Sequence, residues 1–174
     1  MFRAVDNLTG NFNHWDTSNV TNMSMMFQTT NFNRPLNSWN TSNVTDMSYM
    51  FSENTYFNQP LNSWNTSNVT NMAGMLSARS FNQPLDNWDT SNVTDMNMMF
   101  AYASNFNQPL SGRDTSKVFY TDNMFDGATS FNQDLSARTV SGMFSMANML
   151  NNTALSTYNY NAILDSRSQQ NVQN

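Results

Sequence analysis

The sequence predicts an α/β solenoid in which one short parallel strand and one short helix recur in every coil of about 25 residues. Three observations predict this fold class. A motif that begins with Phe-Asn repeats along the chain, an alternating apolar segment follows it, and a Met/Phe cluster with helical spacing comes next. One copy is too small to bury its own apolar face, so we expect the copies to stack.

The repeat is visible in the spacing of the Phe-Asn pairs. Their phenylalanines are 25, 24, 25 and 25 residues apart: Phe32, Phe57, Phe81, Phe106 and Phe131. A shortened copy starts at Phe12, and one valine slot recurs throughout: Val20, Val44, Val69, Val93, Val118 and, in a degenerate copy, Val140. We therefore expect a lead-in or partial cap (1–11), about six repeats (12–150), and a C-terminal cap with a frayed tail (151–174).

The strand is expected at the alternating residues of each copy. In the copy that starts at Phe32, these residues are Leu36, Trp39 and Thr41. A turn at residues 42–44 follows, and Thr45 is expected to cap the helix, with Asp46 in its first turn where the helix dipole favours an anion.

The helix is expected to bury a face of methionine and phenylalanine. Met47, Met50 and Phe51 follow the spacing i, i+3 and i+4. Stacking then predicts two buried ladders, one of leucine (Leu36, Leu61, Leu85, Leu110 and Leu135) and one of methionine (Met50, Met75, Met99 and Met124). We interpret the methionines as packing residues that fill gaps between coils, and not as metal or redox ligands.

The motif Phe-Asn-x-Pro-Leu-x-x-Trp-x-Thr-Ser-x-Val-Thr-x-Met-x-x-Met-Phe, clearest at 32–51 and 81–100, resembles the BspA-like surface-protein repeat. This family is a leucine-rich-repeat variant of bacterial surface lipoproteins and adhesin-like proteins, also known from some protists and large viruses. The resemblance covers residues 12–150 and implies a leucine-rich-repeat-like solenoid at a cell surface. The segment 154–164 resembles the family's closing segment, which implies that Tyr158, Tyr160, Ile163 and Leu164 cover the last coil.

Two positions depart from the family pattern. Threonine stands where the family often has valine, at Thr41, Thr66, Thr90 and Thr115. The tryptophan of Trp15, Trp39, Trp64 and Trp88 becomes arginine at Arg113 and Arg138. Because burial of an unpaired charge is costly, either the tryptophan column is only part-buried or the last two coils are rearranged. We favour part-burial, with Arg113 against Trp88 as a cation–π neighbour.

Composition argues against several functions. Only 11% of the residues are charged, the net charge is −5, and the one lysine and six arginines are scattered, so neither nucleic acid nor anionic lipid is an expected partner. There is no cysteine and no apolar run of 18 residues. The first ten residues lack the apolar core of a secretion signal, so either the chain is not exported by that route or it is a mature or trimmed fragment.

No catalytic, cofactor or metal site is expected. His14 is a lone histidine, and the serines recur in register, whereas a catalytic residue is one of a kind. The glycine signature of calcium-binding repeats is absent. Asn-x-Ser/Thr sequons at Asn19, Asn43, Asn68 and Asn92 follow from the repeated turn, and would accept glycans only in a eukaryotic secretory setting.

The candidate functional feature is a polar face. If Trp39 and Thr41 point inward, the residues between them point outward, and stacking aligns them in rows about 4.8 Å apart. The expected interaction face consists of Asp16, Ser18, Asn40, Ser42, Asn65, Ser67, Asp89, Ser91, Asp114 and Ser116. Such a face is either a binding surface or a merely soluble one.

We expect a non-enzymatic recognition or adhesion module at a cell surface or outside the cell, which binds a protein or glycan through this face. The alternative is a structural subunit of a larger assembly, such as a virion or a cell-surface layer, in contact with neighbouring subunits.

Overall fold

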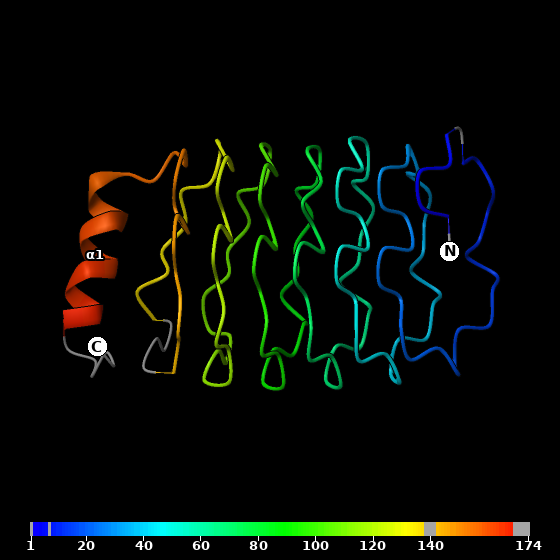
Figure 1. Ribbon diagram of the computed structural model, residues 1–174, viewed down its shortest axis with the longest axis horizontal. Helices are drawn as coiled ribbons and strands as arrows, with labels where there is room; N and C mark the ends of the chain where they lie inside the picture. The colour runs from blue at the N-terminus through cyan, green and yellow to red at the C-terminus, as the bar shows by residue number, and fades with distance from the viewer. Residues whose placement is uncertain (1, 7, 138–141, 169–174) are drawn as a thin grey trace.

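The structure is a row of stacked coils, seen edge-on in the computed structural model of Figure 1. The structure describes residues 2–6, 8–137 and 142–168. Each coil of about 25 residues lies beside the next, from the N-terminal end to a helix, α1 (Thr157–Ser168), at the opposite end. We define the coils by their Phe-Asn starts as 12–31, 32–56, 57–80, 81–105, 106–130 and 131–156.

The predicted α/β solenoid with a strand and a helix in each coil is wrong. Within the described residues, α1 is the one helix, and isolated parallel bridges between the coils take the place of a sheet. These bridges join one position of each coil to the next, in the order Asn22, Asp46, Asn71, Asp95, Tyr120 and Ser145. Most of the backbone consists of turns and irregular segments.

The segment predicted as a helix divides its hydrogen bonds between two coils. Met47, Tyr49, Phe51 and Glu53 donate their backbone N–H groups to carbonyls of the next coil at 2.7–3.0 Å. The residues between them, such as Met50 and Ser52, donate to carbonyls three residues earlier in their own coil. An α-helix needs every N–H group for its own carbonyls, so the ladder between coils replaces it. The spacing i, i+3 and i+4 still buries Met47, Met50 and Phe51.

These overlapping turns require left-handed backbone at one position of every coil. A positive φ of 54–60° recurs there, at Met25, Tyr49, Gly74, Met98, Asn123 and Asn148. A second such position occurs four residues later in most coils, at Thr29, Glu53, Tyr102, Gly127 and Asn152. Positive φ at the third residue of a turn is the geometry of a type II turn and is incompatible with a helix.

The segment predicted as a strand is a pair of successive turns. Trp39 donates its N–H to the carbonyl of Leu36 at 3.2 Å, and Val44 donates to that of Thr41 at 3.0 Å. Thr45 is not a helix cap, because its hydroxyl donates to the carbonyl of Thr21 in the preceding coil at 3.2 Å. The predicted pattern therefore comes from two turns, each of which begins and ends at a buried residue: Leu36 and Trp39 in the first, Thr41 and Val44 in the second.

The predicted leucine and methionine ladders are confirmed, since all nine side chains are at most 3% exposed. The repeated phenylalanines form a parallel stack beside them, with ring centroids 6.1–6.4 Å apart from Phe32 to Phe131. One continuous apolar core thus runs through the coils.

The prediction that the tryptophan column is part-buried is wrong. Trp39, Trp64 and Trp88 are at most 5% exposed, and only Trp15, in the first coil, is open to solvent. Each buried indole N–H donates to a carbonyl of the preceding coil, as Trp64 does to Leu36 at 3.0 Å. At the arginine of this column, Nη1 of Arg113 also donates to a carbonyl of the preceding coil, that of Trp88, at 3.3 Å.

Arg113 therefore contacts the backbone of Trp88, in place of the expected cation–π contact with its ring, and uses a different carbonyl from the leucine carbonyls that Trp64 and Trp88 bond. Burial lowers the pKa of its guanidinium, and the nearby carboxylate of Asp86 partly opposes this effect. Arg138 and Val140 lie outside the described residues.

The side chains of the threonine column also form hydrogen bonds to carbonyls of a neighbouring coil. Thr17, Thr41, Thr66 and Thr90 are buried, and each hydroxyl donates to the carbonyl one position before the equivalent threonine of the next coil, at 2.6–2.9 Å. Valine could fill this space but could not form the bond.

Helix α1 closes the stack through polar contacts as well as apolar ones. Asn132 accepts from the N–H of Ser156 at 2.8 Å and from the side-chain amide of Asn159 at 3.0 Å. Of the four residues expected to cover the last coil, Ile163 is buried, whereas Tyr158, Tyr160 and Leu164 remain exposed.

Candidate functional site

The ten residues predicted as an interaction face lie in successive coils at a turn, and not on a strand. Asp16, Asn40, Asn65, Asp89 and Asp114 are all exposed. Each uses its Oδ1 atom to accept the backbone N–H of the serine two residues later, at 2.9–3.0 Å. The predicted row therefore exists as a surface row, and its acceptors also build the turn that bends each coil.

These turn bonds explain the ionisation of the aspartates in the row. Hydrogen bonds from the hydroxyl and then the N–H of Ser18 lower the pKa of Asp16, and those of Ser116 lower the pKa of Asp114. For Asp89, the N–H of the following serine is the larger cause and its hydroxyl the smaller.

The asparagines of the repeated sequons also bridge coils. Asn43, Asn68 and Asn92 donate their side-chain amides to serine carbonyls of the preceding coil at 2.7–2.8 Å. His14 is exposed in the first coil.

Within residues 2–6, 8–137 and 142–168, no helix combines the length and apolar character that crossing a bilayer requires. The same residues contain no group of three or more histidine or carboxylate side chains arranged to hold a metal ion.

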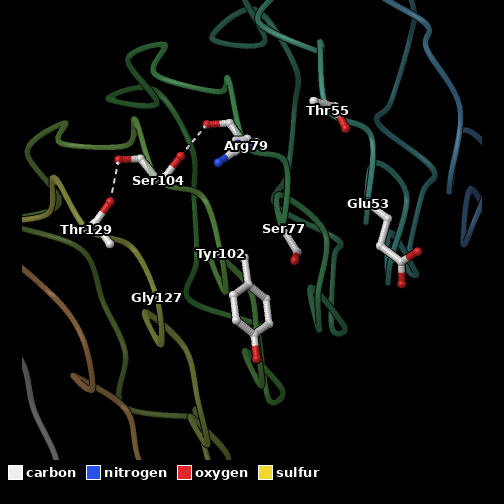
Figure 2. Close-up of a pocket in the computed structure, with 8 residues that line it drawn as sticks. All are labelled: Glu53, Thr55, Ser77, Arg79, Tyr102, Ser104, Gly127 and Thr129. Carbon is white, nitrogen blue, oxygen red and sulfur yellow. Dashed lines mark hydrogen bonds between the residues drawn. The ribbon is translucent and has the colours of Figure 1, made fainter.

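A groove that the sequence reading missed crosses four successive coils (Figure 2). Its volume is about 520 Å³, and it is lined by Glu53, Thr55, Ser77, Arg79, Tyr102, Ser104, Gly127 and Thr129. A smaller hollow of about 200 Å³ adjoins it and shares Glu53, Ser77 and Tyr102. In that hollow Gln28 has a buried amide oxygen without a hydrogen-bond partner.

Left-handed backbone presents the most prominent groove side chains. Glu53 and Tyr102 both have φ of 59°, and Gly127 occupies the equivalent position of the next coil with φ of 74°. The ring of Tyr102 lies in the middle of the groove, beside Gly127 (Figure 2). Glu53 and Tyr102 are exposed, so neither side chain holds the core together.

The hydroxyl groups of the groove donate to the backbone. Ser104 donates to the carbonyl of Arg79, and Thr129 to that of Ser104, both at 3.5 Å (Figure 2). Ser77 donates to the carbonyl of Ala101 in the next coil. Their oxygen lone pairs remain free to accept hydrogen bonds, while the guanidinium of Arg79 can donate and the carboxylate of Glu53 can accept.

Variation between copies is the sequence signal that could have revealed this groove. The equivalent positions of successive coils form a column. One column of the groove consists of Glu53, Ser77, Tyr102 and Gly127, and a second consists of Thr55, Arg79, Ser104 and Thr129. The core and turn columns repeat because each coil must pack in the same way. Columns that change from coil to coil carry no such packing requirement.

The structure and the internal repeat define a repeat protein. The chain belongs to the family described as "Mycoplasma protein of unknown function, DUF285", whose model matches residues 1–88 and again residues 76–163. Two overlapping matches are consistent with a chain of similar units. No curated protein and no solved structure matches the chain.

Proposed function

We propose that this protein is a non-catalytic recognition module, displayed at a cell surface, that binds a protein or glycan partner through the groove in Figure 2. One observation carries the proposal. The groove is lined by two columns of side chains that vary between copies, on a scaffold whose buried leucine, threonine and methionine columns repeat. The resemblance of the repeat to BspA-like surface proteins supports the surface location and the adhesive role.

A rigid scaffold supports recognition because little ordering is needed on binding. Side-chain ladders join each coil to the next: Asn58 accepts from the N–H of Asn82 at 2.9 Å and from the amide of Gln83 at 3.0 Å. Asn82 accepts equivalent bonds from the following coil. The varying groove residues are therefore held at fixed separations.

The chemistry of the lining residues favours binding over catalysis. A nucleophilic serine needs a base that accepts its proton. Ser77 and Ser104 instead donate their hydroxyl hydrogens to backbone carbonyls. The groove lining contains no histidine.

A specific observation favours a second function, that of a subunit in a larger assembly. Threonines line one surface row at Thr45, Thr70 and the half-buried Thr94, but the following coils have Phe119 and Phe144 in that row, 36% and 71% exposed. Their ring centroids are 5.4 Å apart. If this pair packs against a second copy, sedimentation will show oligomers that the change of both residues to threonine dissociates.

The recognition function is tested on an array that carries purified extracellular proteins and oligosaccharides. We expect the wild-type protein to be retained on at least one class of spot. The groove variant Arg79→Gln/Tyr102→Asn should lose this retention, and Tyr158→Asn on α1 serves as the control at an exposed tyrosine outside the groove. Equal retention of all three proteins, or none by the wild type, would contradict the proposal.

A further inference from the structure

The ring of Tyr102 forms an open platform in the groove. The side chain is 68% exposed, and a Cβ atom at Gly127 would lie 2.8 Å from its Cδ1 atom. Any other residue at position 127 would therefore displace the ring. Because Gly127 has no side chain, the ring of Tyr102 rests against the backbone of the next coil. The rest of the ring is open to a ligand.

Tyrosine is not the least strained residue type at this position. The equivalent positions of the next two coils have Gly127 and Asn152, the residue types that adopt left-handed backbone with least strain. A tyrosine with φ of 59° costs about 1–2 kcal/mol relative to ordinary backbone. Thr29 and Glu53 share this strain, so what distinguishes Tyr102 is its exposed aromatic ring within the groove.

The polar groups around the ring suit a ligand rich in hydroxyl groups. Arg79 presents donors, Glu53 presents acceptors, and the oxygens of Ser77, Ser104 and Thr129 can accept further hydrogen bonds. The negative face of an aromatic ring attracts the positively polarised C–H groups of a sugar ring. An oligosaccharide offers both kinds of contact along its whole length.

The charge and the length of the groove indicate which class of oligosaccharide it can bind. The lining contains one carboxylate and one guanidinium, so its formal charges cancel, and the whole chain has a net charge of −5. This balance favours a neutral ligand over a sulfated or sialylated one. The groove crosses three coil-to-coil steps, or roughly 14 Å at about 4.8 Å per step, which fits a short oligosaccharide.

We propose that the groove binds a neutral oligosaccharide. One of its sugar rings stacks on Tyr102, and hydroxyl groups along the oligosaccharide form hydrogen bonds with Arg79 and Glu53. This inference rests on the proposed recognition function and names its ligand class.

The experiment screens the whole protein against neutral hexose and N-acetylhexosamine oligosaccharides, their sialylated and sulfated counterparts, and unrelated peptides. Saturation-transfer NMR detects binding, and titration gives the dissociation constant. We expect binding of at least one neutral oligosaccharide, with transfer to the C–H protons of one sugar ring.

Tyr102→Asn should weaken that binding by about tenfold or more without lowering the melting temperature, because asparagine accepts left-handed backbone. Tyr102→Phe should retain binding, since the ring is kept. Tyr158→Asn is again the control.

Two results would overturn the sugar assignment: preference for anionic sugars, or neutral-sugar binding that survives in Tyr102→Asn. If no oligosaccharide binds but a protein is retained through Arg79 and Tyr102, the sugar assignment fails while the recognition function stands. If neither class of ligand depends on the groove, both proposals fail.

Discussion

The ring of Tyr49 lies directly against Gly74 of the next coil, so that a Cβ atom at position 74 would overlap its Cδ1 and Cε1 atoms. Gly74 also has φ of 60°. The side chain of one coil thus occupies the space that the next coil leaves open. Tyr102 and Gly127 repeat this relationship in the groove.

Gly74→Ala should therefore destabilise the protein by about 2 kcal/mol or more, since strain and overlap add together. Gly112→Ala is the matched control, because Gly112 has φ of 76° but nothing within 4 Å of its Cβ position. It should lose only the cost of the backbone conformation. Denaturant unfolding measures both variants, and adding Tyr49→Ala to Gly74→Ala should restore part of the loss. Equal losses in the two glycine variants would show that the ring contact is unimportant.

Phe81→Ala should cost about 3–5 kcal/mol, the range for a buried phenylalanine. Its ring lies between those of Phe57 and Phe106, with centroids 6.1 Å away on each side. Because each coil contacts only its neighbours, the faster hydrogen exchange should be confined to the adjoining coils. A uniform loss of protection along the chain would contradict this nearest-neighbour behaviour.

Thr66→Val tests the buried threonine column. Thr66 is 1% exposed. Its hydroxyl donates to the carbonyl of Asp89 at 2.8 Å. Valine keeps the shape but leaves that carbonyl unsatisfied, so we expect a loss of about 1–2 kcal/mol in the free energy of unfolding. Thr70→Val, which removes an exposed bond of 3.2 Å to Thr45, should cost less. A Thr66 variant as stable as the wild type would mean that packing alone holds the column.

The aspartates of the turn row predict a loss of stability in acid. Their pKa values are lowered in the folded state, so their contribution is present above the unfolded pKa of about 3.9 and is lost as the pH falls through the folded value. Asp89→Asn/Asp114→Asn should flatten the fall in melting temperature below about pH 4, because asparagine accepts the same turn bond at Asn40 and Asn65. Asp165→Asn on α1 is the control, and an unchanged acid profile in the double variant would rule out this cause.

The sequence predicted the features that depend on spacing alone. The leucine and methionine ladders follow from the period, whatever the local backbone, and they are buried as expected. The choice between helix and turn could not be made in this way, because Met47, Met50 and Phe51 are buried by either arrangement. The left-handed positions could not be predicted from residue type either. Tyr49 and Met98 occupy positions with positive φ, where glycine or asparagine is expected.

The site was missed for a related reason. The interaction face was predicted at the repeated polar column of Asn40, Asn65 and Asp89. These residues repeat because their side chains form the turn that every coil needs. The groove has no repeated motif, and Tyr102, Arg79 and Gly127 come together only when the coils stack. A comparison of the copies for the columns that vary would have selected these positions.

The central claim is that repeated residues build the scaffold and varying residues bind. Tyr102→Asn tests it most directly, through ligand retention and melting temperature measured on the same preparation. We predict that binding is lost while the melting temperature stays at or above that of the wild-type protein. Retained binding by a well-folded Tyr102→Asn variant, or a loss of binding that only accompanies unfolding, would contradict the claim.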